Sequence, residues 1–126
     1  MKSKWYISIW LEGKYIDFWF FNHFFSGFLT ASFLIFLETP HWLNFVLLFV
    51  LMILWEAYEY KNKVREMISN KLVDLLVGLF GFLFMYFLAN LEIFDYAKLF
   101  MSTFILYSIL EIWGFWAYKK DLIMKT

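Results

Sequence analysis

Apolar residues fill most of this chain and are grouped in four long runs that short polar segments separate. The runs cover about residues 18–37, 41–60, 72–91 and 96–118. Each is about 20 residues long, which is the length of a helix that crosses the hydrocarbon core of a bilayer. The pattern therefore predicts an all-α membrane protein with four transmembrane helices.

Composition agrees with this prediction and excludes several classes of function. Of the 126 residues, 63% are hydrophobic and 26% are aromatic. A soluble domain of this size has too few charged residues to cover so much apolar surface. The formal net charge of zero argues against a nucleic-acid partner. The absence of cysteine excludes disulfides, thiolate metal sites and cysteine nucleophiles.

The two ends of the chain differ from the apolar runs. Residues 1–17 mix aromatic and charged side chains, which is typical of a segment lying at the level of the lipid head groups. We therefore predict an interfacial N-terminal arm over residues 1–17, a four-helix transmembrane bundle over residues 18–118 and a basic cytoplasmic tail over residues 119–126.

Basic residues predict the orientation of the bundle. Lys and Arg accumulate in the cytoplasmic segments of membrane proteins. In a four-span topology only Lys98 lies on one side of the membrane, so both termini are predicted to be cytoplasmic. The basic residues on the other side are Lys2, Lys4, Lys14, Lys61, Lys63, Arg65, Lys71, Lys119, Lys120 and Lys125.

Small residues recur at helical spacing and predict where helices approach closely. Ser26/Thr30 and Gly27/Ala31 both form small-xxx-small pairs in the first run. Such pairs let membrane helices pack with their backbones close together. Polar and small residues also follow one face of the other helices, and we expect these faces to point to the bundle interior; they include Asn70, Asp74, Gly78, Gly81, Thr103, Tyr107, Glu111, Gly114 and Tyr118.

Ionisable residues inside the apolar runs form the candidate site. In this topology His23, Glu56, Glu59, Asp74 and Glu111 lie at nearly the same depth, in the cytoplasmic leaflet. Charged groups are costly inside a membrane and usually mark function. Glu56 and Glu59 are one helical turn apart and share a face. Four helices therefore contribute to one predicted cluster.

Each member of this cluster also has a structural explanation. Asp74 in the first turn of a helix would be favoured by the helix dipole, whatever its function. Glu59 can pair with Lys63 as an ordinary solvated helix end, and His23 can be a packing residue. Glu56 and Glu111 lie deeper, so a structural role for them requires a buried partner such as His23 or a Tyr hydroxyl.

Two kinds of chemistry fit an imidazole surrounded by carboxylates. The first is a divalent cation held by oxygen and nitrogen ligands from His23, Glu56, Glu59, Asp74 and Glu111. The second is metal-free acid/base catalysis or proton relay with His23, Glu56 and Asp74 as the catalytic groups. A di-iron site is disfavoured, because the chain contains no Glu-x-x-His motif.

The order of these motifs resembles the VanZ-like group of small bacterial membrane proteins over about residues 22–85. The resemblance is carried by His23-Phe24 with Gly27, by Glu56-x-x-Glu59 and by Asp74-x-x-x-Gly78-x-x-Gly81. Gly78 stands where that family usually has Asn. The resemblance implies a multi-pass protein of the bacterial inner membrane that is associated with the cell envelope and with reduced sensitivity to glycopeptide antibiotics. It also implies that the polar residues typical of that family correspond to His23, Glu56, Glu59 and Asp74 in this chain.

These observations lead to three hypotheses of different classes. In the first, the cluster binds a cation or a lipid head group, with membrane lipids as partners, and acts on an envelope lipid. In the second, the chain is not an enzyme but an oligomeric channel, a pore-forming effector or a membrane subunit of a larger complex, such as a defence complex, with copies of itself or another membrane protein as partner. In the third, the cluster only fixes which helices meet. The sequence leaves open whether the protein is an enzyme.

Overall fold

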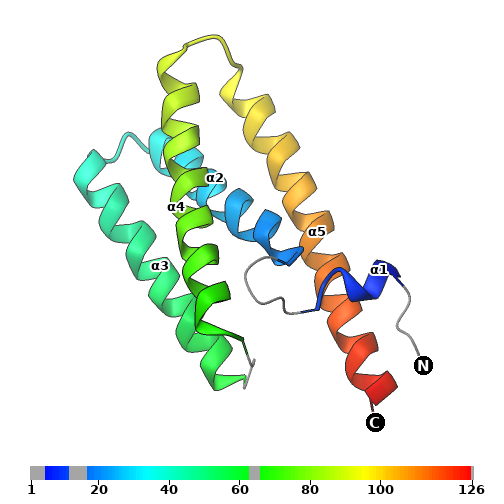
Figure 1. Cartoon of the computed structure of the whole chain (residues 1–126). Coiled ribbons are helices and arrows are strands. Elements are labelled where there is room, and N and C mark those ends of the chain that lie inside the picture. Colours follow the sequence, from blue (N-terminus) through cyan, green and yellow to red (C-terminus); the bar gives the residue numbers. More distant parts are fainter. Residues whose placement is uncertain (1–4, 12–16, 63–65, 126) are drawn as a thin grey trace.

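A computed structural model describes residues 5–11, 17–62 and 66–125 of the chain (Figure 1). Its elements are α1 (Trp5–Ser8), α2 (Trp19–Phe36), α3 (His41–Lys61), α4 (Ile68–Asn90) and α5 (Tyr96–Lys125). The described residues contain no strand. Four helices are long and apolar enough to cross a membrane: α2, α3, α4 and residues 96–121 of α5. The predicted all-α fold with four membrane-length helices is confirmed.

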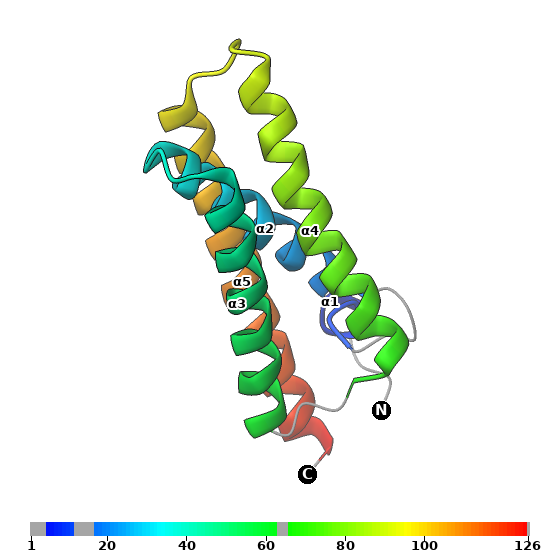
Figure 2. The same cartoon turned by 90° about the vertical axis from the view of Figure 1, so that its left-hand side faces the viewer.

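Helix α2 lies at the centre of the bundle. It packs along α4 over the most extensive interface, and it also contacts α5 and, less closely, α3. Figures 1 and 2 show α3 and α5 on the outside of the α2–α4 pair. Most of the large apolar side chains of α3 and α5 are exposed on the surface of the bundle. Side chains of this kind face lipid in a membrane protein.

Glycines allow α2 and α4 to cross with their backbones in contact. A Cβ atom on Gly27 would overlap the carbonyl oxygen of Gly78, and one on Gly81 would overlap the carbonyl oxygen of Phe24. Ala31 is fully buried in the same interface. The predicted close approach at Gly27/Ala31 is therefore confirmed, and its partner is α4.

On the side of this crossing toward the C-terminal ends of α2 and α4, apolar side chains from three helices form the main core. Helix α2 contributes Phe28, Ala31 and Leu34, helix α3 contributes Leu48, and helix α4 contributes Phe82 and Met85. The core therefore holds α2, α3 and α4 together along one half of the bundle, whereas α5 is held by other contacts.

The N-terminal arm packs against the end of α5. Trp10 is only 1% exposed and lies against the rings of Trp19 and Trp113. The Trp19 indole N–H donates to the Trp10 carbonyl at 3.0 Å, and the Trp113 indole N–H donates to the Tyr6 carbonyl at 3.2 Å. The described part of the predicted arm, residues 5–11 and 17, is thus part of the packed structure, and residues 1–4 and 12–16 lie outside the described residues.

Two helix boundaries differ from the sequence prediction. Helix α4 begins at Ile68, earlier than the predicted start at Leu72. Helix α5 continues to Lys125, so most of the segment predicted as a basic tail is helical. Charged residues such as Lys119 and Lys120 do not break a helix; they only end its apolar stretch.

Helix α1 and the C-terminal end of α5 lie at the same end of the bundle (Figure 1).

Candidate functional site

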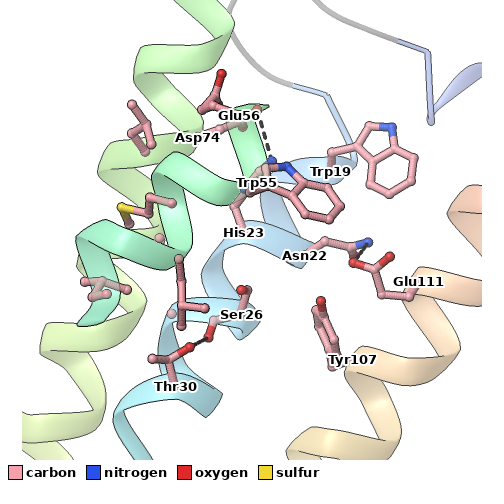
Figure 3. Close-up of a pocket in the computed structure, with 16 residues that line it drawn as sticks. Trp19, Asn22, His23, Ser26, Thr30, Trp55, Glu56, Asp74, Tyr107 and Glu111 are labelled. Carbon is pink, nitrogen blue, oxygen red and sulfur yellow. Dashed lines mark hydrogen bonds and ion pairs between the residues drawn. The ribbon is translucent and has the colours of Figure 1, made fainter. Parts of the chain in front are cut away.

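A cavity of about 200 Å³ lies among the four long helices and is lined by 16 residues (Figure 3). Four residues of the predicted cluster line it, namely His23 of α2, Glu56 of α3, Asp74 of α4 and Glu111 of α5. The structure therefore brings these four residues together around one space. Residues that are far apart in the sequence meet there because α2 is packed on both α4 and α5.

His23 and Asp74 lie in close contact and both line this cavity. The His23 Nε2 atom lies 3.3 Å from Asp74 Oδ2. The Asp74 side chain is 5% exposed and that of His23 is 21% exposed. Because α4 begins at Ile68, Asp74 lies beyond the first helical turn. The helix dipole acts within the first turn, so it does not explain a buried carboxylate at this position.

Glu56 forms an ion pair with Lys71, a residue that the sequence predicted to lie before the third membrane helix. The Lys71 ammonium donates to Glu56 Oε2 at 2.9 Å, and each side chain is 28% exposed. Lys71 belongs to the first turn of α4, which positions it to reach α3. The predicted partners of Glu56 were a histidine or a tyrosine, whereas the observed partner is a cation. The earlier start of α4 is what places Lys71 there.

Glu111 accepts a hydrogen bond from the side-chain amide of Asn22, a residue to which the sequence prediction gave no role. The Asn22 side chain donates from Nδ2 to Glu111 Oε1 at 3.1 Å. The hydroxyl of Tyr107 points toward these two groups (Figure 3). Neighbouring positions on a helix point about 100° apart, so Asn22 faces α5 while His23 faces α4. The adjacency of two polar residues in an apolar run was the signal that could have indicated contact with two different helices.

Glu59 lies outside the main cavity. It lines a smaller cavity of about 60 Å³ together with Glu66 and Tyr118, and His23 and Asp74 border this space as well. Lys63, the predicted partner of Glu59, lies outside the described residues. Glu59 thus shares the smaller cavity with His23 and Asp74, but it does not line the main cavity, to which Glu111 belongs.

The predicted metal centre is not assembled in this structure. Within the described ranges, no three His, Asp or Glu side chains lie close enough together to hold a metal ion. The reason is that the carboxylates of the predicted ligand set have different partners. Asp74 pairs with His23, Glu56 pairs with Lys71 and Glu111 pairs with Asn22, while Glu59 lies in the neighbouring cavity.

Apolar and aromatic side chains complete the cavity wall. The indole rings of Trp19 and Trp55 lie on one side of it in Figure 3, and Leu48, Leu51 and Met52 of α3 also contribute. The ring of His23 contacts that of Trp55 in an edge-on arrangement, with ring centroids 6.4 Å apart. The cavity therefore combines polar groups from all four long helices with an apolar wall that comes mostly from α3, and it suits an amphipathic ligand.

Neither a protein-family model nor a curated protein nor a solved structure matches the chain. The resemblance to VanZ-like proteins consequently stays a prediction, and the function is inferred from the geometry of the cavity.

The Lys71–Glu56 ion pair should make a small contribution to the stability of the bundle. Partly exposed ion pairs contribute about 1 kcal/mol or less to stability. We expect the variants Lys71→Met and Glu56→Gln, measured singly and combined, to show a coupling free energy of about 0.5–1 kcal/mol in a double-mutant cycle of unfolding in detergent. A coupling indistinguishable from zero would contradict a stabilising contact between these two side chains.

Proposed function

We propose that this chain is a small multi-pass protein of the bacterial inner membrane, of the VanZ-like type, whose cavity binds the polar head group of an envelope lipid. The observation that carries the proposal is the His23–Asp74 pair, which lies 3.3 Å apart at the edge of a cavity between helices long enough to span a membrane. In this proposal His23 and Asp74 act as an acid/base pair on the bound head group.

The contact between His23 Nε2 and Asp74 Oδ2 suggests a role for each residue of the pair. When Asp74 accepts the Nε2 proton, the neutral His23 ring carries its lone pair on Nδ1. A carboxylate in this position orients the imidazole and stabilises its protonated form. His23 can therefore accept a proton from a hydroxyl of the head group or from a water molecule, and Asp74 is its positioning residue. Glu56, which is paired with Lys71, is left with a structural role.

The size of the cavity supports a head group as its occupant. Pockets that enclose a drug-sized ligand measure about 300–1,000 Å³, whereas this cavity measures about 200 Å³. A polar head group fits into that space, and its acyl chains would stay outside the bundle in the bilayer. The apolar wall formed by Leu48, Leu51 and Met52 suits the glycerol and upper acyl region.

The arrangement favours this function over an oligomeric channel. A channel built from several copies needs its charged groups to face an axis between the copies. Here His23, Asp74 and Glu111 face a cavity within one chain. An intrachain site for a ligand therefore accounts for the geometry without a second copy.

Filling the cavity tests the proposed function. Ser26 lines the cavity and is exposed toward it, so a phenyl ring at this position occupies the space without removing any of the polar pairs. We expect Ser26→Phe to lose at least about 90% of the bound lipid seen by native mass spectrometry of the detergent-released protein, a change of about tenfold in occupancy.

The matched control for this experiment is Ser102→Phe. Ser102 is exposed on α5, where its hydroxyl bonds only to carbonyl groups of its own helix. This variant should keep the wild-type lipid occupancy. Equal occupancy in wild type, Ser26→Phe and Ser102→Phe would overturn the proposed function, because the lipid would then be bound elsewhere on the surface.

A further inference from the structure

Two buried oxygen atoms in the cavity wall lack a hydrogen-bond partner. They are Asn22 Oδ1 and Asp74 Oδ1, and both residues are 4% exposed. Within the described residues, the Trp55 indole N–H, which belongs to the same lining, is a buried donor without an acceptor. The orientation of the Asn22 amide follows from its bond to Glu111, because a carboxylate requires the NH₂ group on its side. A buried acceptor without a donor costs free energy. The two atoms therefore point to a ligand that supplies N–H or O–H donors.

The charge of the cavity wall specifies the ligand further. Among the described residues that line the cavity there is no Lys or Arg, whereas Glu56, Asp74 and Glu111 are present. Glu56 is neutralised by Lys71, which lies outside the lining. In the described part of the chain, Glu111 has no ion pair with Lys or Arg. A carboxylate that is partly buried among membrane helices favours a cation as its neighbour.

Aromatic rings in the cavity lining also favour a cationic ligand. Trp19, Trp55 and Tyr107 line the cavity together with Glu111. The faces of aromatic rings attract cations, and tryptophan does so most strongly. The cavity thus presents carboxylate and amide oxygens beside three aromatic side chains, and this combination disfavours an isolated phosphate or carboxylate.

We propose that the head group bound in this cavity carries a primary ammonium, which donates to Asn22 Oδ1, Asp74 Oδ1 and the Glu111 carboxylate. This inference rests on the proposed function, namely that the cavity binds a lipid head group, and it names the chemical class. A quaternary ammonium carries the same charge but has no N–H group, so it leaves both buried oxygens unsatisfied. An uncharged glycerol head group offers hydroxyl donors but no charge for Glu111.

The test compares three lipids with identical dioleoyl chains and different head groups. The full-length protein in detergent is titrated with phosphatidylethanolamine, phosphatidylcholine or phosphatidylglycerol, and bound lipid is counted by native mass spectrometry. We expect the wild type to bind phosphatidylethanolamine at least about tenfold more tightly than the other two, as charge-assisted hydrogen bonds imply. Free ethanolamine at millimolar concentration should compete with it.

Glu111→Gln probes the charge directly. It keeps the size of the side chain, and we expect it to reduce the preference for phosphatidylethanolamine to about twofold or less. Retained binding of phosphatidylcholine and phosphatidylglycerol shows that the variant is folded. The matched control is Glu38→Gln, because Glu38 is exposed in the turn after α2 and does not line the cavity; this variant should keep the wild-type preference.

The outcomes separate the two proposals. If all three lipids bind equally and Ser26→Phe blocks all of them, the cavity binds lipid but the primary ammonium is not what it recognises, and the present inference is overturned. If Ser26→Phe blocks none of them, the proposed function falls and this inference falls with it. A preference for phosphatidylethanolamine that persists unchanged in Glu111→Gln also overturns the inference, because recognition then lies elsewhere on the lipid.

Discussion

Replacing Gly27 by Ala should prevent the bundle from reaching its native packing. The new methyl group would overlap the carbonyl oxygen of Gly78, which is a backbone atom on the neighbouring helix and cannot move away alone. Overpacking of a well-packed core costs about 1–3 kcal/mol when side chains can adjust. A clash with backbone exceeds that range, so we expect a loss of more than about 3 kcal/mol in the free energy of unfolding. Tryptophan fluorescence during unfolding in detergent measures this loss.

Gly78→Ala is the matched control, since it makes the same substitution at the same crossing. A Cβ atom at Gly78 would first meet the terminal methyl group of Met52 at 3.0 Å, and this flexible side chain can shift. Alanine also has a higher helix propensity than glycine, by about 1 kcal/mol. Gly78→Ala should therefore stay within about 1 kcal/mol of the wild type. Similar stabilities for Gly27→Ala and Gly78→Ala would contradict the close crossing of α2 and α4.

Asp74→Ala should cause the largest loss of activity among substitutions in the cavity. It removes the carboxylate that holds His23 Nε2 at 3.3 Å, so the imidazole loses both its orientation and the charge that stabilises its protonated form. General acid/base catalysis contributes about 10²–10⁴-fold to a rate. We expect at least a ~100-fold lower rate of head-group turnover, measured with an envelope lipid in detergent micelles.

Asp95→Ala is the control for this substitution. Asp95 is exposed before α5, where it accepts a hydrogen bond from the backbone N–H of Lys98, and it is remote from the cavity lining. It should retain the wild-type rate. If Asp74→Ala turns over lipid as fast as Asp95→Ala, then the His23–Asp74 pair is structural and has no catalytic role.

The number and the class of the helices could be predicted because both depend on local composition. A run of about 20 apolar residues has few alternatives to a membrane-length helix. Boundaries were less predictable, as α4 shows by beginning at Ile68 in a polar segment. Hydropathy marks where the apolar stretch begins, whereas the helix can extend through Ser69, Asn70 and Lys71, since none of these residues breaks a helix.

The location of the site was predictable from helical spacing, but its pairings were not. Depth in the membrane grouped His23, Glu56, Asp74 and Glu111, and the structure places all four around one cavity. The pairings depend on how the helices are rotated and how closely they cross, and these depend on long-range packing. Lys71 and Asn22 were missed for this reason, and four of the five predicted metal ligands have separate partners, while Glu59 lines the neighbouring cavity.

The buried contact of Trp10 imposes an order on biosynthesis. Chains are made from the N-terminus, so the arm leaves the ribosome long before α5 exists. Trp10 lies against Trp113 and Gly114, both of which belong to α5. Translation must therefore pass these residues before this end of the bundle can close around Trp10.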